Sequence, residues 1–108
     1  MGKKITDSES IADCPLQAAI NVIGGKWKTI ILYTLADKTL RFGELRKAIP
    51  KITQKMLTQQ LRELEADGLV NRVVYAEVPP KVEYNLTELA EDLRPILGQL
   101  CVWGSGLK

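Results

Sequence analysis

The stretch of sequence that decides the fold is Phe42–Leu69, FGELRKAIPKITQKMLTQQLRELEADGL. Its first part predicts a helix at residues 42 to 48, and Pro50 ends that helix because its ring disfavours helical geometry at the preceding residue. Thr53 is a favourable N-cap for a second, longer helix that extends to about Asp67. The stretch therefore predicts two helices joined by a tight turn.

The second of these helices is amphipathic. Leu57, Leu61 and Leu64 fall on one face, because residues three or four positions apart are neighbours on a helix surface. The opposite face and its flank carry polar and basic side chains, namely Gln54, Lys55, Thr58, Gln59 and Arg62. Side chains of these types can pair with base edges in a DNA major groove, but an ordinary solvated helix face has a similar composition.

The segments on either side of this stretch predict more helices and a hairpin. Apolar residues recur at helical spacing in three further segments, at residues 15 to 23, at about 26 to 37 and after Thr87. Residues 70 to 77 and 82 to 86 alternate with a period of two, and Pro79-Pro80-Lys81 forms a stiff loop between these two strands. We therefore expect an α+β, mainly helical fold: a winged helix-turn-helix with a two-stranded β-hairpin wing and terminal dimerisation helices.

The composition is typical of one soluble globular domain. The chain has 108 residues, of which 45% are apolar and 26% charged. No apolar run approaches the roughly 20 residues that a membrane-spanning helix needs. Residues 1 to 13 are polar and show no period, so we expect a flexible N-terminal arm followed by a single domain at residues 14 to 108. A cytoplasmic location fits this pattern.

The sequence offers no recognisable catalytic or metal centre. It has no histidine, which excludes Ser-His-Asp and Cys-His catalysis by this chain alone. Its two cysteines, Cys14 and Cys101, lie too far apart in sequence to form a CxxC pair. We therefore expect no enzyme activity, no metal ion and no cofactor.

Positive charge is concentrated in the stretch that decides the fold. The net charge is only +2, yet residues 41 to 62 contain six basic residues against one acidic residue. Four of the six precede the second helix or lie at the turn into it, namely Arg41, Arg46, Lys47 and Lys51. Long cations in these places can contact DNA phosphates without reading the base sequence, although one or two of them are expected to be ordinary surface residues.

Six motifs follow one another along residues 14 to 104, namely CPL (14–16), IGGKW (23–27), RFGEL (41–45), ITQKMLTQQLRELE (52–65), DGLV (67–70) and PPKVEYNLT (79–87). Together they resemble the HxlR-type bacterial transcriptional regulators, which are relatives of the MarR group. The resemblance implies a winged helix protein that binds double-stranded promoter DNA as a homodimer. It also implies that the loop with Lys81 is a DNA-contacting wing, whereas a Pro-Pro-Lys loop by itself is more often a simple turn.

The residues that we expect to contact DNA share a basic or amide side chain or a hydroxyl, and they are Arg41, Lys51, Thr53, Gln54, Lys55, Thr58, Gln59, Arg62 and Lys81. Those on the second helix of the stretch would lie in the major groove. The remaining cations would contact phosphates or the minor groove beside it.

Apolar stripes on the first and last helices suggest a homodimer. The candidate interface residues are Leu16, Ile20, Leu93, Ile96, Leu97, Leu100 and Trp103. The family resembled is dimeric through its terminal helices, and two-fold symmetry would place two recognition helices on a pseudo-palindromic site. The alternative is that the last helix closes the core of its own chain.

Cys14 is the candidate redox-sensing residue. It precedes Pro15 at the start of the first helix, where unpaired amide groups and the helix dipole favour a reactive thiol. In several members of the family resembled, the cysteine at this place senses electrophiles, quinones or oxidants. An inert thiol is the alternative. Cys101 lies at the edge of the last apolar stripe, where it suits packing or a disulfide with Cys14 of the other subunit.

These features predict a sequence-specific transcriptional regulator that is switched by thiol modification of Cys14. Repression is favoured, and activation stays open. Two alternatives stay open. One is a regulator with an inert Cys14 that responds to a small aromatic molecule. The other is a winged helix module that binds protein instead of DNA.

Overall fold

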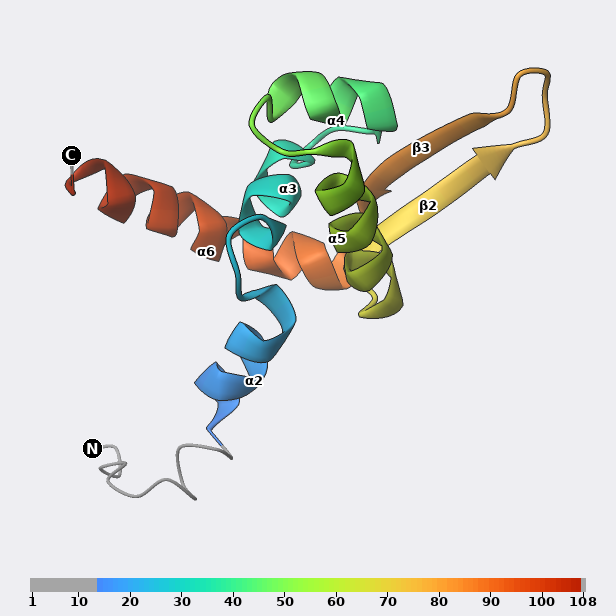
Figure 1. Ribbon diagram of the computed structural model, residues 1–108. Helices are drawn as coiled ribbons and strands as arrows, with labels where there is room; N and C mark the ends of the chain where they lie inside the picture. Colours follow the sequence, from blue (N-terminus) through green and yellow to red (C-terminus); the bar gives the residue numbers. More distant parts are fainter. Residues whose placement is uncertain (1–13, 108) are drawn as a thin grey trace, which may run out of the picture.

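The computed structural model describes residues 14–107 and confirms a mainly helical α+β fold with a helix-turn-helix and a hairpin (Figure 1). The arm expected at residues 1 to 13 lies outside the described residues. The elements are α2 (Pro15–Ile23), α3 (Lys28–Thr34), β1 (Leu40–Arg41), α4 (Phe42–Ala48), α5 (Gln54–Ala66), β2 (Val70–Tyr75), β3 (Lys81–Leu86) and α6 (Glu88–Ser105).

Helix α3 is shorter than the apolar pattern in its part of the sequence predicts. The pattern extends from about residue 26 to 37, whereas α3 spans Lys28–Thr34. The segment after it turns instead of continuing, because Asp37 adopts a left-handed backbone conformation with φ of 61°. The amide of Lys38 then donates to the carbonyl of Leu35 at 3.0 Å, which closes the turn.

The wing belongs to a three-stranded antiparallel sheet, one strand more than the sequence predicts. The strand order is β1-β3-β2, and β1 pairs Leu40 with Tyr84 and Arg41 with Glu83. Two residues are too few to show an alternating pattern, so β1 could not be recognised from the sequence. This short strand joins the base of the hairpin to the start of α4.

The core lies between α3, α4, α5, the base of the sheet and the first half of α6. Its members are apolar, each 9% exposed or less, and they include Ile31, Leu32, Leu45, Leu57, Leu61, Leu64, Leu69, Val70, Tyr84, Leu86, Ala90 and Leu97. The three leucines of α5 are the ones that the helical spacing placed on one face. Burial of that face turns the opposite face of α5 to solvent.

Both ends of α5 are fixed by local hydrogen bonds. At the N-terminus, the hydroxyl of Thr53 accepts a hydrogen bond from the backbone N–H of Met56 at 3.1 Å, as expected for an N-cap. At the C-terminus, Gly68 has a φ of 77°, and the amide of Leu69 donates to the carbonyl of Leu64 at 2.9 Å. Glycine adopts this left-handed conformation without strain, and the conformation ends the helix, so α5 stops at Ala66 with Asp67 as its C-cap.

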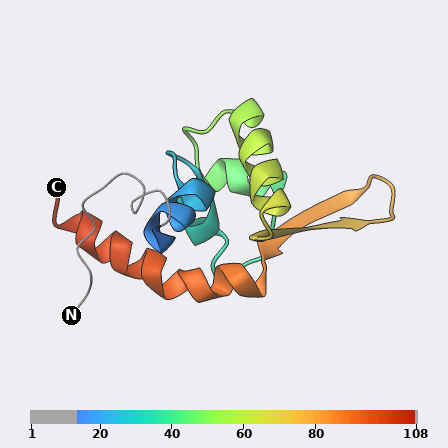
Figure 2. The ribbon, with the colours of Figure 1, turned by 90° about the horizontal axis from the view of Figure 1, so that it is seen from below.

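Three parts of the chain extend outward from the core. The β2–β3 hairpin projects on one side, and the C-terminal half of α6 projects on the opposite side (Figure 2). Helix α2 projects in a third direction and has no buried residue. Among the described residues, no helix combines the length and the apolar character needed to span a membrane.

Thr87 links the end of α5, the sheet and α6. Its hydroxyl donates to the carbonyl of Gly68 at 2.6 Å and accepts from the backbone N–H of Ala90 at 3.3 Å. Its backbone N–H donates to the carbonyl of Leu69 at 3.1 Å. One side chain therefore both caps α6 and holds it against the loop that follows α5.

We expect Thr87→Ala to lower the free energy of unfolding by about 1–2 kcal/mol, because it removes an N-cap and one further hydrogen bond. Urea unfolding at a fixed protein concentration measures the change. Thr87→Ser keeps the hydroxyl and should stay within about 0.5 kcal/mol of the parent protein. Equal stability of the alanine and serine variants would contradict this role.

Candidate nucleic-acid interface

The outer face of α5 carries the side chains that the sequence predicts to read DNA bases. Gln54, Lys55, Gln59 and Arg62 are exposed, and Thr58 is half-buried between them. Together with Glu63 they line one shallow hollow along the helix. The hydroxyl of Thr58 donates to the carbonyl of Gln54 at 2.9 Å, so its proton is used within the helix and its oxygen can only accept further hydrogen bonds. The face can thus offer donors, acceptors and a methyl group to base edges.

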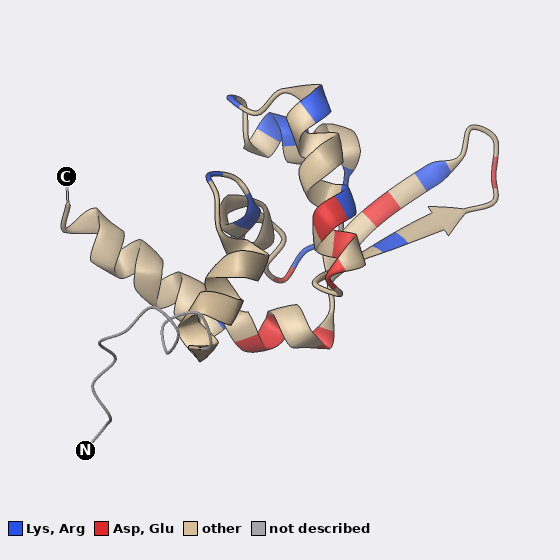
Figure 3. Ribbon diagram, turned by 60° about the horizontal axis from the view of Figure 1, so that its bottom comes forward, with Lys and Arg blue, Asp and Glu red and all other residues tan. Residues whose placement is uncertain are grey.

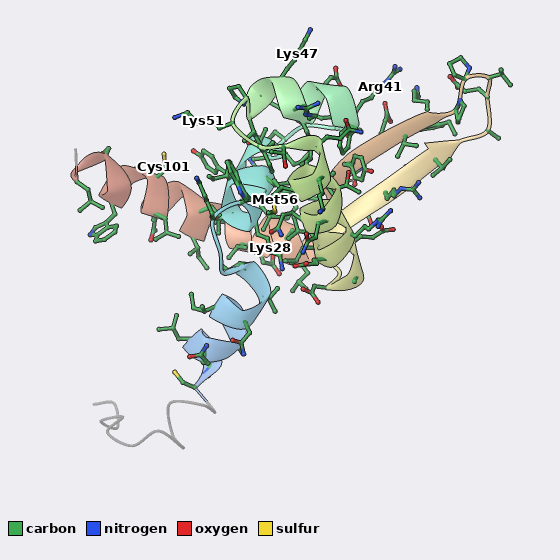
Figure 4. All side chains as sticks on the ribbon, in the orientation of Figure 1. Lys28, Arg41, Lys47, Lys51, Met56 and Cys101 are labelled. Atoms are coloured by element: carbon green, nitrogen blue, oxygen red, sulfur yellow. The ribbon has the colours of Figure 1, made fainter. Side chains whose placement is uncertain are left out.

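The predicted phosphate contacts lie around α4 and the turn before α5. Arg41, Lys47 and Lys51 are exposed, and their side chains point into solvent (Figure 4). The backbone N–H of Arg41 donates to the carboxylate of Glu44 at 2.8 Å, which helps to start α4 at Phe42. Thr53 is also exposed, next to this group, where it caps α5.

Positive and negative side chains are separated along the molecule (Figure 3). Lys and Arg gather on α4 and the turn into α5, whereas Asp and Glu gather at the end of α5 and in the first part of α6. The positive end therefore coincides with the start of the outer face of α5, where a DNA backbone would be attracted.

Lys81, the predicted wing contact, already has two partners in its own sheet. Its Nζ lies 4.5 Å from the ring centroid of Tyr75 and 3.9 Å from a carboxylate oxygen of Glu83. A hydrogen bond to the same glutamate raises the pKa of the Tyr75 hydroxyl above its ordinary value. Beyond Lys81, the tip of the hairpin offers the acidic Glu77 and the fully exposed Val78.

Arg72 is a candidate contact that the sequence reasoning missed. It is exposed on β2, opposite Tyr84 of β3, and it lines one hollow together with Thr58 and Arg62 of α5. The hollow connects the recognition helix to the base of the wing. The alternating pattern could have found this residue, because Arg72 lies two positions after Val70 and so on the side of the sheet that meets α5.

A buried lysine contacts the outer face of α5 from behind. Lys28 begins α3, and its Nζ lies 2.7 Å from Oε1 of Glu63. The other carboxylate oxygen of Glu63 accepts a hydrogen bond from Nε2 of Gln59 at 3.3 Å. The hydrogen bond from Lys28, followed by that from Gln59, lowers the pKa of the Glu63 carboxyl below its ordinary value.

The predicted dimer residues separate into an exposed group and a buried group. Leu16 and Ile20 on α2, and Ile96, Leu100 and Trp103 on α6, are each 49–68% exposed. By contrast, Leu97 is 5% exposed in the core of its own chain, and Leu93 packs against that core. The prediction that Leu97 faces a second subunit is therefore corrected, because the helix turns it toward α3. Leu93 is half-buried, and its predicted place in an interface stays a prediction.

The two cysteines occupy different surroundings. Cys14 is the half-buried N-cap residue of α2, with Pro15 at the first helical position. Cys101 is exposed on α6, beside a hollow lined by residues of α3 and α6 that include Ile30, Tyr33 and Leu100. The sequence favoured packing for Cys101, and the exposed position differs from that expectation. Both thiols are free.

Within residues 14–107, no cluster of three or more acidic or cysteine side chains could hold a metal ion. The chemistry of the outer surface is thus that of cations, amides and hydroxyls on α4, α5 and β2.

Comparison with protein families gives a match to the HxlR-like helix-turn-helix family over residues 22–108. An uncharacterized HTH-type transcriptional regulator from Methanothermobacter thermautotrophicus is 55% identical over 103 residues, which cover 95% of this chain and 77% of the relative. The uncharacterized regulator YtcD of Bacillus subtilis is 58% identical over 90 residues, covering 83% of this chain and 71% of the relative.

Solved structures show the same fold with similar sequences. The redox regulator HypR in its oxidized form superimposes with a TM-score of 0.82 at 56% identity, covering 86% of this chain and 96% of HypR. The reduced form of the regulator YodB from B. subtilis gives a TM-score of 0.74 at 38% identity, covering 83% of this chain and 89% of YodB. By family match, sequence identity and fold, this chain belongs to the HxlR-like helix-turn-helix family of DNA-binding transcriptional regulators.

Proposed function

We propose that the protein is a homodimeric repressor that binds a pseudo-palindromic operator and responds to thiol modification. The observation that carries this proposal is the outer face of α5, on which Gln54, Lys55, Gln59 and Arg62 stand exposed. Repression would follow from occupation of promoter DNA in the cytoplasm, where the bound protein excludes RNA polymerase.

The part of α5 from Gln54 to Arg62 enters the major groove. Arg62 and Lys55 can donate to the acceptors of guanine, and Gln54 and Gln59 can pair with adenine. Thr58 offers its methyl to thymine. The acidic residues that follow, Glu65 and Asp67, lie at the end of the helix that leaves the groove.

The cations outside α5 position the helix by contacting phosphates. Arg41 and Lys51 stand beside the start of α5, and Arg72 stands beside Arg62 at the base of the wing. Lys81 contacts DNA less strongly in this proposal than Arg72, since leaving Tyr75 and Glu83 costs part of what a phosphate contact gains.

A second copy of the chain covers the exposed stripe of α6. Ile96, Leu100 and Trp103 follow one another at spacings of four and three residues, so they form one continuous line on the helix. The exposed leucine and isoleucine of α2 supply further apolar surface. Large apolar side chains that stand together on a surface mark an interface more often than a solvated face.

DNA binding is tested by selecting operator sites from a random double-stranded library and then titrating the selected site at several salt concentrations. We expect preference over scrambled DNA, two chains per site, and a log-log salt slope of about −0.9 for each phosphate contacted. Arg62→Ala should abolish the preference, and Arg72→Ala should reduce the slope by about one without changing the preferred bases.

Lys81→Ala should change the salt slope of DNA binding less than Arg72→Ala does. Lys38→Ala removes an exposed lysine in the turn after α3 and serves as the matched control. Equal affinity for selected and scrambled DNA would contradict the regulator and favour a protein-binding winged helix.

Dimerisation is tested with charged substitutions on α6. Leu100→Glu lies in the exposed stripe and should raise the dimer dissociation constant at least about tenfold, which sedimentation over a range of concentrations measures. Val102→Glu is the matched control, because Val102 is exposed on another side of the same helix. An equal effect of both variants, or a wild-type protein that sediments as a monomer, would oppose this interface.

Thiol sensing is supported by the position of Cys14 at the start of α2 and by the similarity to HypR and YodB, of which the first is named a redox regulator. We expect diamide treatment to change the affinity for the selected operator at least about fivefold, a coupling typical of allosteric switches. Cys14→Ser should remove this response. Cys101→Ser shows whether the second thiol takes part. A Cys14→Ser protein that still responds to diamide would contradict the sensor.

A further inference from the structure

Among residues 14–107, Lys28 is the one charged residue that is buried, with 8% of its surface exposed. It begins α3, and Figure 4 places it inside the molecule beside α5. An unpaired ammonium in such a place would be costly, so its partner must be fixed and ionised. That partner is Glu63 on α5, whose Oε1 lies 2.7 Å from Nζ of Lys28.

Glu63 connects this buried charge to a side chain of the outer face. Its carboxylate lines the same hollow as Gln59 and Arg62. Its second oxygen accepts a hydrogen bond from Nε2 of Gln59, one helical turn earlier, at 3.3 Å. The three residues therefore form a chain of contacts from the interior to the surface that would face DNA.

The direction of these hydrogen bonds sets the orientation of the Gln59 amide. An ionised carboxylate only accepts hydrogen bonds, so the NH2 group of Gln59 has to face Glu63. The carbonyl oxygen Oε1 of Gln59 is then left free as an outward acceptor, together with one remaining N–H. A glutamine without such a partner can rotate its amide by half a turn and offer either group.

We propose that Lys28 and Glu63 are positioning residues that turn Oε1 of Gln59 outward, so that Gln59 prefers to contact a base with an exposed amino donor in the major groove. Adenine presents its N6 amino group beside N7, and cytosine presents its N4 amino group, whereas the major-groove edge of guanine has only acceptors. The fixed amide prefers adenine or cytosine and disfavours guanine, because guanine offers no donor to Oε1 and only the remaining N–H of Gln59 can contact it. This inference rests on the proposed function, because it concerns the base preference of the same helix.

The contact with Lys28 also lowers the cost of placing the acidic Glu63 on the outer face of α5, which would face DNA. A free carboxylate beside Arg62 would repel the phosphates and compete for the arginine. Held by Lys28, the Glu63 carboxylate is neutralised from the protein side and turned along the helix. Lys28 itself is too buried to touch DNA, so an effect confined to the position read by Gln59 would pass through Glu63.

The test uses the full-length protein and a random double-stranded DNA library, with base preferences read by sequencing of the bound fraction. The position read by Gln59 is the one whose preference disappears in Gln59→Ala. At that position we expect the parent protein to disfavour guanine by about tenfold or more against the preferred base. Lys28→Met and Glu63→Gln should each reduce this factor below about threefold, while preferences at other positions and the salt slope for scrambled DNA stay unchanged.

Three comparisons separate positioning from a general structural effect. Lys28→Arg keeps a cation and, unlike Lys28→Met, should retain most of the discrimination against guanine. Lys38→Met removes an exposed lysine and should leave the profile unchanged. The double variant Lys28→Met/Glu63→Gln should lose no more discrimination than either single variant, because both act on the same amide. Glu63→Gln leaves the Lys28 ammonium without its carboxylate partner, so the double variant, which holds neither charge, keeps the test valid where Glu63→Gln lowers stability.

Failure of this inference and failure of the proposed function look different. If the parent protein selects an operator but both single variants keep the full discrimination against guanine, the inference is wrong and the regulator stands. If the variants lose preference at every position, Lys28 and Glu63 act on the fold as a whole and the inference is again wrong. If the parent protein selects no sequence, both proposals fall together.

Discussion

The complete burial of the leucine face of α5 is the constraint on which the rest of this structure depends. Leu57 and Leu64 have no exposed surface, and Leu61 is 2% exposed. Because a rotation of α5 about its axis would bring these side chains into water, at about 1.5–3 kcal/mol for each leucine, the helix has one favourable rotation. The direction of Gln59 and Arg62 into solvent is a direct consequence of that packing.

Charge in this small protein serves position more than stability. The surface pair between Arg94 and Asp37, at 2.8 Å, joins α6 to the turn after α3, and exposed pairs of this kind contribute modestly. The Lys28–Glu63 contact differs because one partner is buried and the other reaches the outer face of α5. A methionine in place of Lys28 and a glutamine in place of Glu63 could fill the same space. In our proposal the charges of this pair therefore serve to fix the direction of the Glu63 carboxylate.

The sequence predicted the helix-turn-helix almost residue by residue, because Pro50, Thr53 and Gly68 act on the backbone next to them. Each of them starts or ends a helix without a partner that is distant in sequence. The prediction failed where distant contacts decide. Strand β1 exists because Leu40 meets Tyr84, and Leu97 is buried because α3 lies against it. The lysine behind α5 was missed because its partner Glu63 lies far away in the sequence. Arg72 was within reach of the sequence, since the alternating pattern places it on the side of the sheet that meets α5.

Helix α2 has nine residues and buries none of them, so it lies below the length at which isolated helices persist in water. Its last turn packs against the core of the chain through Val22 and Ile23. In the proposed dimer the order of α2 would be coupled to association, and by mass action its folded fraction would rise with the amount of protein in the cell. The thiol at its start would thus report on oxidants with a sensitivity that depends on gene dosage.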